Sequence, residues 1–291
     1  MTFVITGSTG SFGHHVVTTM LDRGVAPGEV VATGRDLARV ADLADRGVQT
    51  RRADYEDADS LRAAFDGADV VLLVSGTELG QRVAQHRNAV EAAAQAGVGL
   101  LAYTSLAHCD RSGMRIAADH RDTEQTIAES GLPHVLLRNG WYMENYTSQL
   151  GSYVLAGAVT GCARDGRVSA ATRDELAEAA AAVLLADGQA GAVYELGGDE
   201  AFSLTELAAA VTDATGQPVS YLDESPEDFT HTLVRAGLPE PYAESLADAD
   251  LGIARGDLLV TTGDLSRLLG RPTTSMADAV HEAARSLTAQ D

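Results

Sequence analysis

The chain has 291 residues, 45% of them hydrophobic, which is enough to bury the core of one large domain or of a large and a small one. Its formal net charge of −21 at pH 7 disfavours DNA and RNA as partners, because an acidic surface repels polyanions. All 21 residues counted as Lys+Arg are arginine. Chemistry that needs a lysine amine is therefore excluded, including Schiff-base catalysis, a P-loop and a Tyr-x-x-x-Lys dyad.

The cysteines and the N-terminal residues bear on the cellular compartment. Cys109 and Cys162 lack the C-x-x-C spacing of a zinc or redox site and are too few for a disulfide framework. The N-terminal residues carry no signal-peptide pattern, and no window reaches the roughly 18 apolar residues that a spanning helix needs. We expect a cytoplasmic protein that binds no metal and no membrane.

Six short runs rich in β-branched and aliphatic residues alternate with helical segments through the first half of the chain. The runs cover residues 2–6, 29–33, 48–52, 69–75, 99–105 and 134–138. The segments between them place apolar residues at helical spacing, and several end on a glycine, as helices often do. This alternation predicts an α/β fold with a doubly wound parallel sheet of the Rossmann type, which binds ligands at the carboxyl ends of its strands.

The pattern changes after about residue 145, where clear strands become fewer. Residues 172–175 and 203–206 both match the S/T-x-x-E capping box that starts a helix, and prolines concentrate between residues 218 and 241. We expect a Rossmann domain over residues 1–145, with some later elements returning to it, and a smaller C-terminal lobe for the substrate over residues 146–291.

A glycine-rich loop follows the first predicted strand. Gly7, Gly10 and Gly13 form a G-x-x-G-x-x-G spacing that runs directly into a helix. Glycine allows the tight turn and the close approach of the backbone to a pyrophosphate, and the helix N-terminus favours negative charge. This context predicts a dinucleotide site.

Residues at the ends of later strands indicate which dinucleotide binds. Arg35 follows the second strand, where an NAD-selective site more often has a carboxylate, so it favours the 2′-phosphate of NADPH; Asp36 weakens this assignment unless it caps a helix. Asp54, after the third strand, is placed to accept from the adenine amino group. The small residues at 75–77, after the fourth strand, leave room for a ribose.

Several longer stretches resemble a known family. They include ITGSTGSFGHHVV (5–17), RRADYED (51–57), ELGQRVAQHRN (78–88), LLAYTSLAH (100–108) and LLRNGWYMENY (136–146), and the likeness continues to GRPTTSMADAV (270–280). The chain resembles the NmrA-like atypical short-chain dehydrogenases, most closely the bacterial type 2 NAD(P)H:quinone oxidoreductases. The resemblance implies an enzyme that transfers a hydride from NADPH directly to a quinone, without flavin or metal.

The glycine loop, the strand ends and the resemblance together predict the cofactor-binding residues. They are Gly7, Ser8, Thr9, Gly10, Ser11, Phe12, Arg35, Asp54, Ser75, Gly76, Thr77, Asn139, Gly140, Trp141, Tyr142, Met143 and Glu144.

Reduction of a quinone does not require the missing Tyr-Lys dyad. Hydride addition gives an aromatic hydroquinone anion that is only weakly basic, so orientation over the nicotinamide and hydrogen bonds to the quinone oxygens suffice. Tyr142 is the first candidate for such hydrogen bonds, followed by Asn145, Gln81 and His108. The alternative for each is a packing residue, and for His108 an ordinary exposed loop histidine.

His120 and Glu124 lie four apart on one predicted helix, in the region where classical relatives keep the dyad. The pair could relay a proton or anchor the helix, and we favour the anchor; we expect Ser105 to be structural as well. Two other functions remain open: an NADP(H)-binding redox-sensor regulator without turnover, and a reductase of another conjugated acceptor such as a triphenylmethane dye. The expected partners are a small quinone and a second copy of the chain.

Overall fold

The computed structural model describes residues 1–288, which form two compact units. The first unit comprises Met1–Leu106, Asp119–Asn139 and Arg173–Tyr194. The second comprises Ala107–Ala118, Gly140–Thr172 and the described residues from Glu195 onward. The chain therefore passes between the units at several points, whereas a single main boundary was predicted at residue 145. Residues 173–194 are the later element that rejoins the first unit.

A parallel sheet organises the first unit. Its strands are β1 (Phe3–Ile5), β2 (Val30–Gly34), β3 (Gln49–Arg52), β4 (Val70–Leu73), β5 (Leu100–Leu106), β6 (His134–Asn139) and β8 (Val193–Leu196). The order across the sheet is β3-β2-β1-β4-β5-β6-β8, and the neighbouring pairs from β3 to β6 are all parallel. The six strands predicted from sequence are confirmed, as is the doubly wound α/β class.

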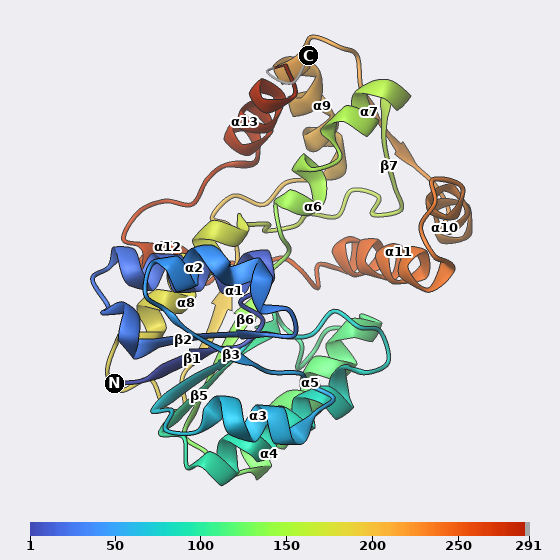
Figure 1. The fold of residues 1–291 in the computed structure, drawn as a ribbon. Coiled ribbons are helices and arrows are strands. Elements are labelled where there is room, and N and C mark those ends of the chain that lie inside the picture. Colours follow the sequence, from blue (N-terminus) through green and yellow to red (C-terminus); the bar gives the residue numbers. More distant parts are fainter. Residues whose placement is uncertain (289–291) are drawn as a thin grey trace. The chain divides into compact units, whose positions relative to one another are not determined.

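The strands form here because both faces of the sheet are covered. Every residue of β2 and of β4 is buried, which explains the continuous aliphatic runs VVAT and VVLL. Helices α1 (Ser11–Asp22) and α8 (Arg173–Leu184) lie side by side on one face, and α3 (Ala58–Phe65) and α4 (Arg82–Ala96) on the other (Figure 1). Short pieces complete this unit: η1 (Pro27–Glu29), η2 (Leu37–Val40) and α2 (Ala41–Asp45). Helix α5 (Arg115–Glu129) follows β5.

The strand order reverses between β1 and β4, which places a binding crevice at their carboxyl ends. The loops after β1, β2, β3 and β4 therefore open on the same edge of the sheet. These are the loops in which the sequence predicts most of the cofactor residues.

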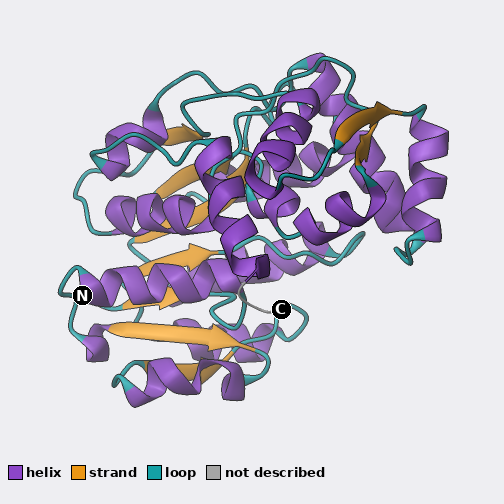
Figure 2. Cartoon of the chain, turned by 90° about the horizontal axis from the view of Figure 1, so that it is seen from above, coloured by secondary structure: helices purple, strands orange, loops and turns teal. Residues whose placement is uncertain are grey.

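The second unit is mainly helical. Its helices are α6 (Glu144–Thr147), α7 (Leu150–Ala156), α9 (Leu204–Thr215), α10 (Pro226–Arg235), α11 (Glu240–Arg255), α12 (Asp264–Leu269) and α13 (Met276–Thr288). The capping box predicted at 203–206 is present, with Ser203 and Glu206 bonding each other's backbone N–H groups. Two short strands, β7 (Ala158–Gly161) and β9 (Ser220–Asp223), pair in parallel, and Figure 2 shows them in orange among helices. The sequence did not predict this pair.

No helix among the described residues is long and apolar enough to cross a membrane.

Candidate cofactor site and catalytic region

The loop between β1 and α1 has the backbone geometry that its glycines predict. Gly7 adopts a φ of +61°, a left-handed conformation that other residues rarely adopt. A Cβ on Gly13 would lie 2.6 Å from the Gly7 carbonyl oxygen, so the first turn of α1 packs directly against the loop. Helix α1 begins at Ser11, and its N-cap Gly10 offers no side-chain cap, which leaves the first N–H groups of the helix available to an anion. The loop fits the pyrophosphate of a dinucleotide.

Ser8 and Phe12 have structural roles within this loop. The Ser8 hydroxyl donates to the Ile5 carbonyl oxygen at 2.8 Å, and the Ser8 N–H donates to the Thr33 carbonyl oxygen at 2.9 Å, so the loop is tied to β1 and β2. Phe12 is buried against the core from the first turn of α1. Both contacts hold the loop in shape and leave its backbone to face a ligand.

Arg35 extends from the end of β2 and is two-thirds exposed. Its Nη1 donates to Glu78 Oε1 at 2.7 Å, and Gln85 donates to the other Glu78 oxygen at 2.9 Å. These two hydrogen bonds, that from Gln85 first, lower the pKa of Glu78 below its ordinary value. Asp36 is the N-cap of η2 and accepts from the Ala38 N–H at 3.1 Å. Because Asp36 has this capping role, it does not weaken the assignment of Arg35.

Asp54 lies after β3, at the same edge of the sheet. Its carboxylate accepts from the Glu56 N–H at 3.1 Å and lies 3.6 Å from Arg52 Nη2. The next residue, Tyr55, donates from its hydroxyl to the Val74 carbonyl oxygen at 2.6 Å. Tyr55 therefore ties the β3 end to the β4 end, just before the predicted site residues Ser75, Gly76 and Thr77.

Asn139, the last residue of β6, gives the clearest sign of an absent ligand in this unit. Its side chain is 5% exposed, and neither its amide nitrogen nor its amide oxygen has a hydrogen-bond partner among the described residues. A buried amide without partners costs free energy, and native proteins seldom leave one. Asn139 fits a ligand with a hydrogen-bonding group, and the β1–α1 loop fits a ligand with a phosphate. A dinucleotide has both.

The predicted site residues 140–144 belong to the second unit. A Cβ on Gly140 would lie 2.9 Å from the Leu196 carbonyl oxygen, so this position needs a glycine. The backbone of Ala171 forms two hydrogen bonds with this segment. The Ala171 N–H donates to the Trp141 carbonyl oxygen, and the Met143 N–H donates to the Ala171 carbonyl oxygen. Met143 is buried, whereas Trp141, Tyr142 and Glu144 are partly exposed.

The four predicted substrate-orienting residues differ in accessibility. Tyr142 and Asn145 are both partly exposed at the start of α6, and the Asn145 N–H donates to the Tyr142 carbonyl oxygen at 3.1 Å. Gln81 is exposed and forms the N-cap of α4. His108 is 7% exposed, so the alternative that it is an exposed loop histidine is wrong.

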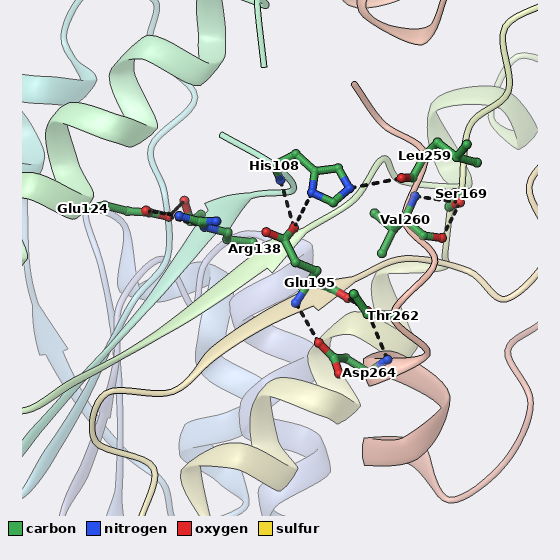
Figure 3. A network of polar contacts seen from close by, with 10 residues as sticks. His108, Glu124, Arg138, Ser169, Glu195, Leu259, Val260, Thr262 and Asp264 are labelled. Atoms are coloured by element: carbon green, nitrogen blue, oxygen red, sulfur yellow. Dashed lines mark hydrogen bonds and ion pairs between the residues drawn. The ribbon is translucent and has the colours of Figure 1, made fainter. Parts of the chain in front are cut away.

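Contacts on both sides hold His108 in the second unit (Figure 3). Its Nε2 lies 3.0 Å from the Leu259 carbonyl oxygen, and its Nδ1 lies 3.4 Å from Glu195 Oε2. The His108 backbone N–H also donates to Glu195 Oε2 at 2.9 Å, and the residue has a φ of +53°. These partners secure a backbone conformation that is uncommon outside glycine.

His120 and Glu124 face the sheet, and each is held there. His120 Nδ1 shares a hydrogen bond of 2.7 Å with the hydroxyl of Tyr103, which is fully buried on β5. Glu124 accepts two hydrogen bonds from Arg138 on β6, at 2.9 and 2.7 Å, and one from the Ser105 hydroxyl at 2.6 Å (Figure 3). Burial, followed by the charge of Arg82, lowers the pKa of His120 well below its ordinary value. This geometry favours the anchor over the proton relay.

Two features of the site region were not singled out from the sequence. Arg82 and His86 on α4 are buried and contact the backbone of Gly76. Their spacing of four residues on a helix is the only local signal that could have drawn attention to them. Arg138 was treated only as part of a strand. A charged residue at the end of an aliphatic strand can indicate a buried ion pair, which Arg138 forms with Glu124.

The two adjacent histidines of α1 have separate carboxylate partners. His14 Nε2 lies 2.8 Å from Asp42 Oδ2, and His15 forms an ion pair with Asp174. Within residues 1–288, no group of three or more His, Cys, Asp or Glu side chains could hold a metal ion.

Comparison with known proteins identifies the family. The model of the NmrA-like family matches residues 1–253. Quinone oxidoreductase 2 of Escherichia coli is 44% identical over 276 residues, which are 95% of this chain and 96% of that protein.

Solved structures agree with this match. The crystal structure of the NADPH-dependent quinone oxidoreductase of Escherichia coli with NADPH has a TM-score of 0.93 at 42% identity, covering 98% of this chain and 99% of that one. The Citrobacter sp. triphenylmethane reductase in complex with NADP(H) has a TM-score of 0.92 at 33% identity, covering 97% and 100%. The chain belongs to the NmrA-like family.

Proposed function

We propose that this protein is an NADPH-dependent oxidoreductase that transfers a hydride directly to a quinone, without flavin or metal. The observation that carries the proposal is the 44% identity, across nearly the whole chain, to an Escherichia coli quinone oxidoreductase. A protein this similar has been crystallised with NADPH. The glycine loop and the unpartnered amide of Asn139 support the same cofactor in this chain.

In this proposal, different residues of the first unit bind different parts of NADPH. The backbone N–H groups of residues 9–12 face the pyrophosphate, and Arg35 binds the 2′-phosphate, which its guanidinium can grip with two hydrogen bonds. Asp54 accepts from the adenine, and residues 75–77 leave room for a ribose. Asn139 would offer an amide donor and acceptor to the cofactor. NADPH supplies the hydride when it is bound.

This chain's own residues mainly orient the quinone. The hydroquinone anion formed by hydride addition is weakly basic, so water or a weak acid protonates it, and alignment of the ring lowers the barrier most. Tyr142 is the proposed donor to one quinone oxygen, with Asn145 as a further donor. Both side chains are partly exposed, as substrate contact requires.

His108 has a different role in this proposal. Because its Nε2 faces the Leu259 carbonyl oxygen and its Nδ1 faces Glu195, we assign it to positioning the loop after β5 instead of donating to substrate. His120 and Glu124 take no part in proton transfer, because each is held by buried partners on the sheet.

Reduction of another conjugated acceptor is a second candidate. The triphenylmethane reductase of Citrobacter sp. shares 33% identity and a TM-score of 0.92 with this chain, and a further structure of that enzyme is described as acting on triphenylmethane dyes. We infer that a conjugated dye of this kind, like a quinone, would accept a hydride from NADPH.

One assay compares these functions. Loss of the NADPH absorbance is followed after addition of a benzoquinone, a naphthoquinone or a triphenylmethane dye, with NADH as the alternative donor. Faster oxidation with the quinones than with the dye is the expected result. Faster turnover of the dye would favour the second candidate. Tight NADPH binding without turnover of any acceptor would instead favour a redox-sensing regulator.

We place the protein in the cytoplasm, which is supported by two buried cysteines that form no disulfide. Its partner there is the small quinone, and the acidic charge argues against nucleic acid.

A further inference from the structure

The backbone of Gly76, in the middle of the turn that follows β4, is held by two side chains of α4. Its N–H donates to His86 Nε2 at 3.0 Å, and its carbonyl oxygen accepts from Arg82 Nε at 2.9 Å. Residues 82 and 86 lie on one face of the helix because they are four apart. Both polar groups of a single peptide residue are therefore satisfied by side chains instead of by the sheet.

These two side chains are themselves anchored to α5. Arg82 Nη1 donates to Asp119 Oδ2 at 2.8 Å, and His86 Nδ1 lies 3.0 Å from Thr123 Oγ1. The Thr123 hydroxyl donates onward to the Asp119 carbonyl oxygen at 2.9 Å. The chain of hydrogen bonds thus runs from the turn through α4 to α5, inside the first unit.

The hydrogen bond from Gly76 decides the protonation of His86. Because Nε2 accepts, it carries no hydrogen, and the hydrogen of the neutral ring sits on Nδ1 and is donated to Thr123. His86 is fully buried and Arg82 is 4% exposed. Burial and then the charge of Arg82 lower the pKa of His86 to about 3, so the ring stays neutral under ordinary conditions.

Packing restricts the ring as well. Tyr55 and Tyr103 meet His86 edge to face, with ring centroids 6.0 and 5.4 Å away. Tyr55 in turn bonds the Val74 carbonyl oxygen, two residues before Gly76. A Cβ on Gly76 would lie 3.1 Å from Gln85 Oε1, so the turn also sits close to α4. Neither the ring nor the turn can shift without breaking several contacts.

We propose that His86 and Arg82 are positioning residues that hold the 75–77 turn in the conformation that receives NADPH. The inference rests on the proposed function, since that is what places this turn beside the cofactor. A preformed turn pays no ordering cost when NADPH binds, so affinity depends on these contacts. Their loss raises the Kd and KM for NADPH more than it lowers kcat.

The test compares two substitutions of His86. His86→Phe keeps a ring between Tyr55 and Tyr103 but removes the acceptor for Gly76, and it should raise the Kd for NADPH about tenfold, the usual effect of one unpaired buried donor. His86→Gln places an acceptor near the position of Nε2 and should recover affinity to within about threefold of wild type. The Kd is measured by NADPH fluorescence well below each variant's melting temperature, and KM and kcat with a naphthoquinone.

Two further variants keep the result interpretable. Val90→Ala, in the buried core on the same helix, should lower the melting temperature without changing the Kd. If His86→Phe does not fold, Thr123→Val removes the hydroxyl that accepts from Nδ1 and donates to the Asp119 carbonyl oxygen, and it should raise the Kd about threefold, in the same direction. A lower melting temperature with unchanged Kd in His86→Phe, or equal affinities in the Phe and Gln variants, would overturn the proposal. Because the Kd needs no quinone, failure of the proposed quinone turnover is seen separately.

Discussion

Arg35 Nη1 lies 2.7 Å from Glu78 Oε1, so the arginine proposed to bind the 2′-phosphate already holds an anion from its own chain. Gln85 holds the other oxygen of the same carboxylate at 2.9 Å. The Glu78 carboxylate and the 2′-phosphate present the same kind of charged oxygen to a guanidinium. We therefore expect NADPH to compete with Glu78 for Arg35, whereas NADH, which lacks the phosphate, should not.

Replacing Glu78 should change the preference between the two cofactors. In Glu78→Gln the ion pair is lost, and the Kd for NADPH should fall about two- to fivefold, in keeping with the small free energy of an exposed pair. The Kd for NADH should stay the same. Titrations with both cofactors at low salt provide the measurement, and Glu56→Gln, a nearby carboxylate that bonds Gln85 but not Arg35, serves as the control. A parallel gain for NADH would contradict competition with the phosphate.

Removing the guanidinium should have the opposite effect. Arg35→Ala should raise the KM for NADPH about tenfold or more, because charge-assisted hydrogen bonds to the phosphate are lost, and should leave kcat within about twofold. Arg39→Ala, an exposed arginine on η2, is the matched control. Adding Glu78→Gln to Arg35→Ala should give no further change, since the two residues act through one contact. Undiminished NADPH binding in Arg35→Ala would remove its assigned role.

The sequence predicted the parts of this fold that depend on local pattern. The buried strands β1, β2, β4, β5 and β6 appear as runs rich in aliphatic residues, and the glycine spacing at 7, 10 and 13 marks the loop in which Gly7 has a positive φ and Gly13 packs closely. Strands β7 and β9 were missed because each has only four residues, and most residues of β9 are exposed. They also pair across about 60 residues of chain, and no local periodicity indicates such a pairing.

The sequence also could not predict side-chain partners that come from distant segments of the chain. His108 was predicted to orient substrate. Its ring instead contacts Glu195 and Leu259, which lie 87 and 151 positions later in the chain. The His120–Glu124 spacing showed correctly that the two share a helical face. It could not show that Tyr103 and Arg138 on neighbouring strands hold them there.

The anchoring role of His120 predicts a loss of stability without a loss of chemistry. His120→Ala leaves a cavity and removes the buried hydrogen bond to the Tyr103 hydroxyl, so it should lower the free energy of unfolding by about 2–4 kcal/mol, while kcat with a quinone stays within about twofold. Urea denaturation and steady-state rates at a temperature where the variant is folded give the two readouts. A fall in kcat of tenfold or more, with stability unchanged, would instead support a proton relay.

Wild-type stability should also fall as the pH drops below about 6.5, the ordinary pKa of histidine. His86 and His120 have lowered pKa values in the folded state, so the unfolded chain takes up protons there that the folded chain does not. Urea midpoints between pH 5 and pH 7 measure this trend. The trend should be weaker in His120→Ala, and an equal slope in both proteins would contradict it.

Asp250 predicts the opposite trend in the second unit. Its carboxylate accepts from the Cys162 N–H at 2.8 Å, and burial raises its pKa from an ordinary 3.8 to about 6. Between these two pH values the folded chain keeps a proton that the unfolded chain has lost. The contribution of Asp250 to stability is therefore greatest below pH 3.8 and is lost as the pH rises through 6.

Asp250→Asn cannot ionise, so the variant should not lose stability as the pH rises through 6. Its amide oxygen still accepts from the Cys162 N–H. The variant should be more stable than wild type by about 2–3 kcal/mol at pH 8, the value of a shift of roughly two pKa units, and by less than about 1 kcal/mol at pH 4. Urea unfolding at both pH values measures the difference, with Glu240→Gln, an exposed carboxylate on the same helix, as the control. If Asp250→Asn were destabilising at pH 8, the carboxylate would have to be ionised and favourably held in the folded protein, contrary to the burial that raises its pKa.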